Sequence, residues 1–113
     1  MTDRKAKYWS DIVNAIIEIE GFTSDIASLN DYRRDLKTKR AVERGLAIIG
    51  EAVGKLLKED PQLQIAGSHA IVGMRNRLIH SYDNVDDKIV WEVVRKHLGI
   101  LRSEAEVWIT KDQ

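Results

Sequence analysis

The chain has 113 residues, which suffice for one hydrophobic core but not for two, so we expect a single domain over residues 1–113. Lys plus Arg equal Asp plus Glu, 18 against 18, so any contact with nucleic acid must come from a local patch. The chain has no cysteine, which excludes disulfides and thiolate chemistry, and its lack of a long apolar run predicts a cytoplasmic protein without a membrane span.

Apolar residues recur at helical spacing along the whole chain, and Pro61 is the single proline. We therefore predict an all-α fold, a compact antiparallel bundle of four to five helices. The first helix carries an apolar stripe between Trp9 and Ile19 and is predicted to end near Gly21, because glycine suits the left-handed position after a helix.

Two further helices are predicted before the proline. Thr23 or Ser24 is expected to cap a short helix that reaches Leu29. The longest helix is then predicted from about Arg33 to Lys58, with Glu59-Asp60-Pro61 as its stop.

The long helix has an unusually wide apolar arc. Its two apolar stripes lie about 100° apart around the helix axis and consist of Val42, Leu46, Ile49, Val53 and Leu57, and of Ala41, Gly45, Ile48, Ala52 and Leu56. Gly45, Gly50 and Gly54 each cost about 1 kcal/mol of helix propensity relative to alanine, which predicts the close approach of another backbone. That neighbour is either a second subunit or another part of the same chain.

The same region carries a basic face. Arg33, Lys37, Arg40 and Arg44 follow one another at steps of four, three and four residues. Such a face is either a solvated surface, partly neutralised by nearby acids, or a short track for the phosphates of RNA. Arg77 is a further candidate contact for RNA.

Two helices are predicted after the proline. Ser68, following Gly67, is a plausible N-cap for a helix that carries MRNRLIHSY and ends near His80. A last helix is predicted to begin near Asp86. It presents an apolar seam for packing inside the bundle, formed by Trp91, Val94, Leu98, Leu101, Ala105 and Trp108.

Reactive side chains are concentrated in MRNRLIHSY. Asn76 and His80 share one helix face, so Asn76 could hold the imidazole in one tautomer. Arg75 and His80 are five residues apart, about 140° around the axis, and would meet only at a helix end or across a symmetry axis. Tyr82 is expected at the mouth of the site.

This set of side chains fits RNA cleavage without a metal. Such a reaction needs a base for the 2′-hydroxyl proton, an acid for the leaving oxygen and a cation beside the charged phosphorane. One histidine cannot supply both proton transfers, whereas a homodimer would supply two histidines and two arginines. The spacing R-x4-H by itself is a weak signal that a structural helix end would also explain.

The residues around the motif add specificity. Arg75 is followed directly by Asn76, His80 completes the R-x4-H spacing, and Tyr82 stands two residues later, within VGMRNRLIHSYDNVD. Together with ERGLAIIGEAVGKL upstream, this stretch resembles the HepT family of HEPN ribonuclease toxins, and the resemblance extends from the Asp11 region through the final helix.

The resemblance implies an all-helical homodimer whose two motifs meet in a cleft and cut mRNA or tRNA without metal. Arg75 would bind the scissile phosphate, His80 would transfer protons, and Asn76 would orient the site. The chain would carry no cofactor. Its partner in a type VII toxin–antitoxin pair would be an MntA-like nucleotidyltransferase, which uses ATP and Mg²⁺ to transfer AMP onto Tyr82.

Two features of the family leave alternatives open. Members of the wider group also serve as noncatalytic companions of nucleotidyltransferases, so a dimeric module that binds such a partner, and with it a nucleotide, is the second hypothesis. The family often carries a proline and a tryptophan shortly before the arginine, where this chain has Gly67 and Ser68.

Overall fold

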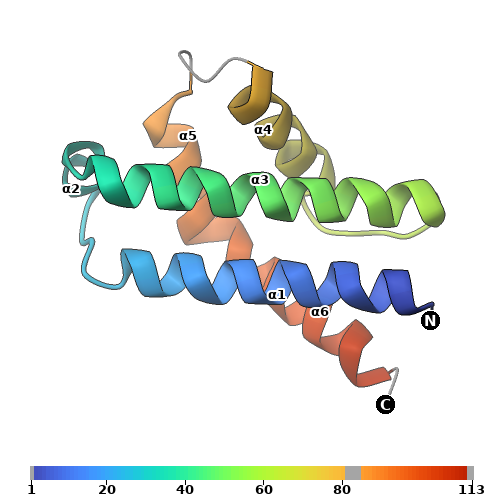
Figure 1. The fold of residues 1–113 in the computed structure, drawn as a ribbon. Helices are drawn as coiled ribbons and strands as arrows, with labels where there is room; N and C mark the ends of the chain where they lie inside the picture. The colour runs from blue at the N-terminus through green and yellow to red at the C-terminus, as the bar shows by residue number, and fades with distance from the viewer. Residues whose placement is uncertain (1, 81–84, 112–113) are drawn as a thin grey trace.

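The computed structural model describes residues 2–80 and 85–111, and all regular structure in these two segments is helical (Figure 1). The all-α prediction is therefore confirmed. Two long helices, α1 (Asp3–Thr23) and α3 (Leu36–Glu59), run antiparallel and are connected through the short α2 (Leu29–Arg34). None of the helices in the described segments combines the length and apolar character that crossing a lipid bilayer requires.

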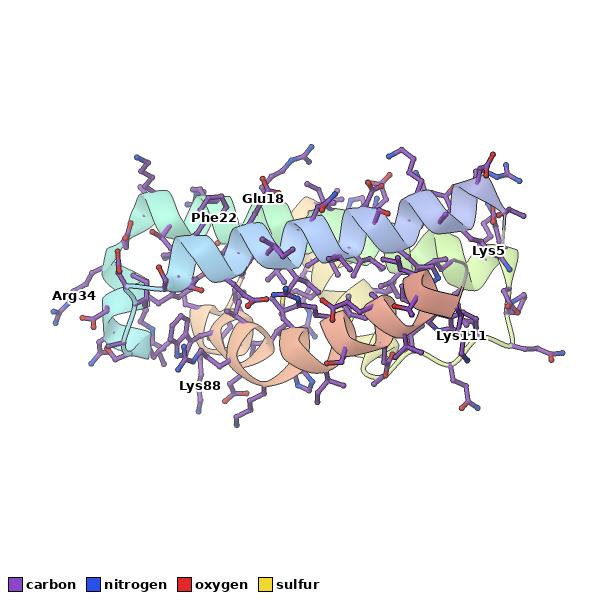
Figure 2. All side chains as sticks on the ribbon, turned by 90° about the horizontal axis from the view of Figure 1, so that it is seen from below. Lys5, Glu18, Phe22, Arg34, Lys88 and Lys111 are labelled. Atoms are coloured by element: carbon purple, nitrogen blue, oxygen red, sulfur yellow. The ribbon has the colours of Figure 1, made fainter. Side chains whose placement is uncertain are left out.

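The remaining helices cover this pair. The helix α4 (Ser68–His80) packs on α3, and α6 (Leu98–Lys111) packs on α1. The short α5 (Asp87–Glu92) and a π-helical turn, η2 (Val93–His97), lead directly into α6. Seen from below, Glu18 and Phe22 lie on the solvent-exposed face of α1 (Figure 2).

The first helix continues past the glycine at which it was predicted to end. Thr2 caps its start, because its hydroxyl accepts a hydrogen bond from the Lys5 backbone N–H at 3.1 Å. At the other end the buried Thr23 hydroxyl donates to the Ile19 carbonyl oxygen at 2.8 Å. This bond satisfies the hydroxyl and occupies a carbonyl of the last turn, so α1 includes Gly21 without a left-handed residue.

The predicted second helix was misplaced. Ser28 caps α2 by accepting from the Asp31 N–H at 3.1 Å, so this helix begins at Leu29, where it was predicted to end. Asp35 then caps α3, since its carboxylate accepts from both the backbone N–H and the hydroxyl of Thr38, at 3.0 and 2.7 Å. The long helix therefore starts at Leu36, and Arg33 belongs to α2. The predicted stop before Pro61 is confirmed.

Most of the wide apolar arc of α3 is buried within the single chain, and its remaining members, Ala41, Ile48 and Leu57, are half-buried. One side of α3 faces α1 and the other faces α4. A Cβ on Gly45 would lie 2.8 Å from Ile19 Cδ1, and one on Gly50 would meet Arg75 and the Ile71 carbonyl. Gly54 has no such neighbour within 4 Å, so the prediction of a close approach is wrong there.

The last helical stretch starts as predicted but changes register midway. Asp86 caps α5, its carboxylate accepting from the Lys88 N–H at 2.9 Å. Val90 of α5 and Val93, the first residue of η2, are buried, and the next buried residue is Leu98, a step of five residues that matches the i→i+5 bond of η2. The predicted seam is consequently fully buried only from Leu98 to Ala105. Trp91, Val94 and Trp108 pack at its margin.

Aromatic pairs fix both ends of the core. Trp9 stacks on Trp108 with ring centroids 6.0 Å apart, joining the start of α1 to the end of α6. Tyr32 stacks on Trp91 at 5.3 Å, joining α2 to α5. These contacts join α6 to α1 and α5 to α2, while α4 packs mainly on α3.

Candidate functional site

The helix α4 presents the motif, and a glycine precedes it. Gly67 has a φ of 70°, a left-handed conformation that side-chain-bearing residues rarely adopt. Its carbonyl accepts from the Ile71 N–H at 3.0 Å, and Ser68 is already the first helical residue. The expected N-cap role of Ser68 is therefore wrong by one position.

Contact with α3 fixes the position of α4. Ile71 and Met74 are buried against the core. A Cβ on Gly50 would lie 2.9 Å from Arg75 Cγ and 3.1 Å from the Ile71 carbonyl oxygen, so only a residue without a side chain permits this crossing. The stem of Arg75 is thereby held against the backbone of α3.

The polar end of Arg75 is only partly satisfied. Its Nη1 donates to Asn76 Oδ1 at 3.2 Å, while its buried Nε has no hydrogen-bond partner among the described residues. Asn76 thus contacts the arginine of the motif. No hydrogen bond joins Asn76 to His80 within the described residues, so its predicted role in orienting the imidazole stays a prediction.

His80 is exposed at the end of α4. It stands five residues beyond Arg75, which is about 7.5 Å along the helix axis, and no hydrogen bond joins the two in residues 2–80. As expected for one straight helix, a single chain does not bring the two side chains together. Arg77 is exposed on the same helix. Tyr82, the predicted modification site, lies outside the described residues.

The structure separates the predicted basic track. Arg33 lies on α2, whereas Lys37, Arg40 and Arg44 are exposed on α3. Arg40 is engaged, because its Nη1 lies 2.9 Å from Glu43 Oε1.

Arg44 and Arg75 both act on one carboxylate of α3. The pKa of Glu51 is lowered mainly by the hydrogen bond and charge of Lys55, and additionally by the charges of Arg75 and Arg44. Of the predicted track, Arg44 therefore shares an electrostatic partner, Glu51, with the motif arginine.

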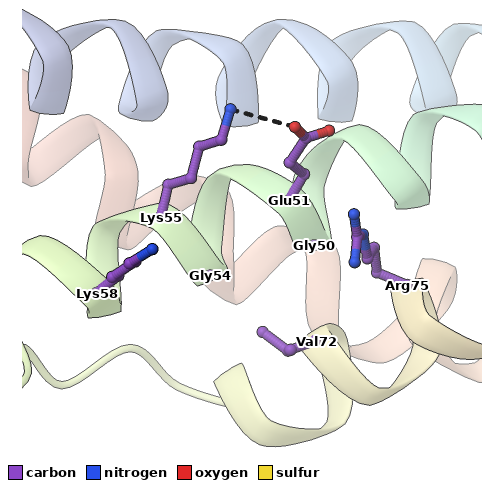
Figure 3. Close-up of a pocket in the computed structure, with 7 residues that line it drawn as sticks. All are labelled: Gly50, Glu51, Gly54, Lys55, Lys58, Val72 and Arg75. Carbon is purple, nitrogen blue, oxygen red and sulfur yellow. Dashed lines mark ion pairs between the residues drawn. The ribbon is translucent and has the colours of Figure 1, made fainter.

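A groove of about 240 Å³ lies between α3 and α4 next to Arg75 (Figure 3). Its lining consists of Gly50, Glu51, Gly54, Lys55, Lys58, Val72 and Arg75. The sequence interpretation missed Lys55 and Lys58. Spacing could have revealed both, because Lys58 follows Arg44 and Glu51 at steps of seven residues and so shares a helix face with the basic track, and Lys55 stands one turn after Glu51.

No cluster of three or more side chains suited to hold a metal ion is found in residues 2–80 and 85–111. The polar groups that the motif presents in these segments are the guanidinium of Arg75, the amide of Asn76 and the exposed imidazole of His80, all on α4. The fold and this site define an all-helical protein with an R-x4-H motif at the end of a helix.

Comparison with known proteins assigns that class to a family. A family model described as "Ribonuclease HepT-like" matches residues 12–107. The "Probable ribonuclease HepT" of Thermococcus cleftensis is 36% identical over 100 residues, covering 88% of this chain and 90% of that protein. This chain therefore belongs to the HepT-like ribonuclease family.

Two further relatives match over somewhat shorter stretches. A protein of Methanocaldococcus jannaschii, provisionally named an RNase, is 37% identical over 89 residues, covering 74% of this chain and 69% of its own length. One of Caldanaerobacter subterraneus subsp. tengcongensis, named in the same way, is 35% identical over 88 residues, covering 76% and 78%. No solved structure gives a significant match.

Proposed function

We propose that this protein is a metal-independent endoribonuclease, the toxin of a type VII toxin–antitoxin pair. One observation carries the proposal. In a chain of the HepT-like ribonuclease family, α4 presents Arg75, bound to Asn76 beside an open groove, and ends in an exposed His80.

The chemistry assigns one role to each side chain. His80 accepts the proton of a ribose 2′-hydroxyl, whose oxygen attacks the adjacent phosphorus. The bond from phosphorus to the 5′-oxygen breaks, and that oxygen takes a proton from the histidine of a second copy. Arg75 offers two parallel N–H donors to the phosphorane oxygens, which carry the developing charge. The products are a 2′,3′-cyclic phosphate and a 5′-hydroxyl.

The arrangement within one chain supports a homodimer as the active form. Arg75 and His80 are about 7.5 Å apart along α4, and one imidazole cannot act as base and acid in the same step. Two copies of α4 meeting at their C-terminal ends would place both arginines and both histidines around one phosphate.

Regulation follows from the tyrosine of the motif. A phenol is a poor nucleophile at neutral pH, because the ordinary pKa of tyrosine is near 10. Modification of Tyr82 therefore requires a nucleotidyltransferase partner that binds ATP and Mg²⁺ and aligns the α-phosphate with the phenol. The phenol oxygen displaces pyrophosphate, and the attached AMP adds bulk and negative charge near the motif.

The catalytic test compares two histidines of the same helix. Purified wild type, His80→Ala and His69→Ala are incubated with single-stranded RNA in EDTA, and the new ends are identified. We expect cyclic phosphate ends from the wild type and from His69→Ala, because His69 is an exposed residue at the start of α4. The cleavage rate of His80→Ala should be at least about 100-fold lower than that of the wild type. Equal cleavage by His80→Ala would refute its role, and a strict need for metal would refute the metal-independent mechanism.

The regulatory test uses the partner itself. The protein and Tyr82→Phe are each co-expressed with the nucleotidyltransferase, and intact mass and RNase activity are measured. An AMP adduct on Tyr82 with loss of activity is expected, and Tyr82→Phe should escape both. Complete inhibition without an adduct would mean that the partner acts by binding alone. A wild type that binds the partner but leaves RNA intact would instead favour the noncatalytic module.

A further inference from the structure

The groove beside Arg75 results from the way α4 crosses α3. The two helices are closest at Gly50, where a Cβ would lie 2.9 Å from Arg75 Cγ. One turn later they have separated, and a Cβ on Gly54 would meet nothing within 4 Å. The groove lies between this open glycine surface and Val72 of α4 (Figure 3).

Cationic side chains border both ends of the groove. Gly50, Gly54 and Lys58 follow at steps of four on one face of α3, so Lys58 stands about 12 Å along the axis from the Arg75 contact. Figure 3 shows Lys58 at one end and Arg75 at the other, with Val72 between them. Lys58 forms no ion pair within the described residues.

The single acid of the groove is already neutralised. Lys55 Nζ lies 3.1 Å from Glu51 Oε1 and 5.6 Å from the centre of the Tyr8 ring, which holds this lysine toward α1. Lys58 and Arg75 therefore leave a net positive charge across an apolar floor of glycine backbone and valine. This combination fits a flat base on the floor and phosphates at the ends.

The size of the groove favours a segment of polymer over a free small molecule. About 240 Å³ is below the ~300–1,000 Å³ of pockets that enclose a whole small ligand. A single nucleotide of a longer strand needs only partial enclosure, because its neighbours continue along the surface. The adjacent Arg75 is the residue to which we assign the scissile phosphate.

We propose that the groove between α3 and α4 is an RNA subsite, which holds the nucleotide next to the cleaved bond between Gly54 and Val72 and its outer phosphate at Lys58. The proposal rests on the ribonuclease function proposed above. It adds Gly54, Val72 and Lys58 as positioning residues for the substrate, in a part of the surface distinct from the histidine.

The test fills the groove without disturbing the helix crossing. Gly54→Leu places a side chain in open space, and Gly21→Leu is its matched control, an exposed helical glycine of α1 with nothing within 4 Å. Lys58→Gln removes the end charge, with Lys88→Gln, exposed on α5, as control (Figure 2). Binding of a labelled single-stranded RNA is measured by fluorescence anisotropy in variants that also carry His80→Ala, so that the RNA stays intact. KM and kcat are measured in the same variants with His80 present.

We expect Gly54→Leu, which blocks the base platform, and Lys58→Gln, which removes a phosphate contact, each to weaken binding about tenfold and to raise KM with kcat nearly unchanged. Both controls should match the parent. Unchanged affinity and KM in Gly54→Leu would overturn the subsite while the ribonuclease function stands. RNA binding that depends on Gly54 without any cleavage by the wild type would refute the function and retain the subsite.

A second copy of the chain is the competing occupant of the groove. Light scattering of wild type and Gly54→Leu at the same concentration distinguishes RNA from a second copy of the chain as the occupant of the groove. An unchanged mass with weakened RNA binding supports the subsite. Dissociation of a wild-type dimer by Gly54→Leu would place a protein surface in the groove and overturn the RNA proposal.

Discussion

Gly50 of α3 and Arg75 of α4 are in direct contact, and a Cβ at Gly50 would lie 2.9 Å from Arg75 Cγ and 3.1 Å from the Ile71 carbonyl oxygen. The position of the motif arginine therefore depends on a glycine 25 residues earlier in the chain. This contact also sets where the two helices separate and hence where the groove opens.

Two glycines one helical turn apart should respond to alanine with opposite signs. Gly50→Ala forces α4 away from α3 and should lower the free energy of unfolding by about 1–3 kcal/mol. Gly54→Ala meets nothing and should raise it by up to about 1 kcal/mol, because alanine favours the helix. Urea unfolding followed by circular dichroism measures both. A stabilised Gly50→Ala protein would contradict the close crossing.

Replacing Arg75 with lysine tests geometry separately from charge. Lysine keeps the positive charge but loses the planar fork and the bond to Asn76, so we expect cleavage to fall at least about 100-fold with the fold intact. Arg34→Lys, an exposed change on α2, is the control (Figure 2). Initial rates of cleavage of a fluorogenic RNA measure the effect. Full activity in Arg75→Lys would mean that Arg75 contributes only its positive charge and not its planar geometry.

The active protein should be larger than one chain. The site needs two copies of a motif with one histidine, so light scattering at micromolar concentration should give twice the 12.9 kDa chain mass. Specific activity should also fall on dilution through the dissociation constant, as the dimer separates. A fully active protein of single-chain mass would contradict the shared site.

Tyr32 predicts a pH dependence of stability. Its side chain is fully buried, its hydroxyl has no hydrogen-bond partner among the described residues, and burial, with Glu43 and Asp87, raises its pKa well above the usual value near 10. The unfolded chain then releases this proton above about pH 10 while the folded chain keeps it, so folding stability falls as pH rises.

Tyr32→Phe isolates that effect, since every other tyrosine is present in both proteins. At neutral pH the variant should be about 1 kcal/mol more stable, because an unsatisfied hydroxyl is removed. From pH 8 to 11 its advantage should grow by about 1.4 kcal/mol, the linkage of one proton over one pH unit. Denaturant unfolding at both pH values gives the difference, and a constant gap would mean that folding leaves this titration unchanged.

Glu51 should oppose binding of RNA. Its pKa is lowered, chiefly by the hydrogen bond and charge of Lys55, so the carboxylate is ionised at neutral pH. Glu51→Gln removes a negative charge from the groove and releases Lys55, and affinity for single-stranded RNA should rise about threefold, an effect that salt reduces. Weaker binding of Glu51→Gln would mean that the ion pair itself shapes the site.

Local signals in the sequence determined the helical fold and those helix ends at which only one residue could serve as cap or stop. Helical periodicity predicted the all-α fold, Asp86 predicted the start of α5, and Pro61 predicted the stop of α3. These predictions succeed because caps and periodic faces depend on residues within one or two turns.

Other helix ends remained ambiguous because several residues competed for one role. Thr23, Ser24 and Ser28 all have hydroxyls able to cap a helix, and the folded chain uses Ser28, while Thr23 bonds back to Ile19. Burial of Thr23 in the core decides the choice, and burial is a property of the whole fold.

The sequence also determined which side chains could carry the chemistry, because Arg75, Asn76 and His80 stand together on one helix. Only the tertiary structure decided what lies beside them. The contact of Gly50 with Arg75, the open surface at Gly54 and the place of Lys58 all follow from how α4 crosses α3. Such a crossing is set by packing between segments distant in sequence, which no local pattern encodes.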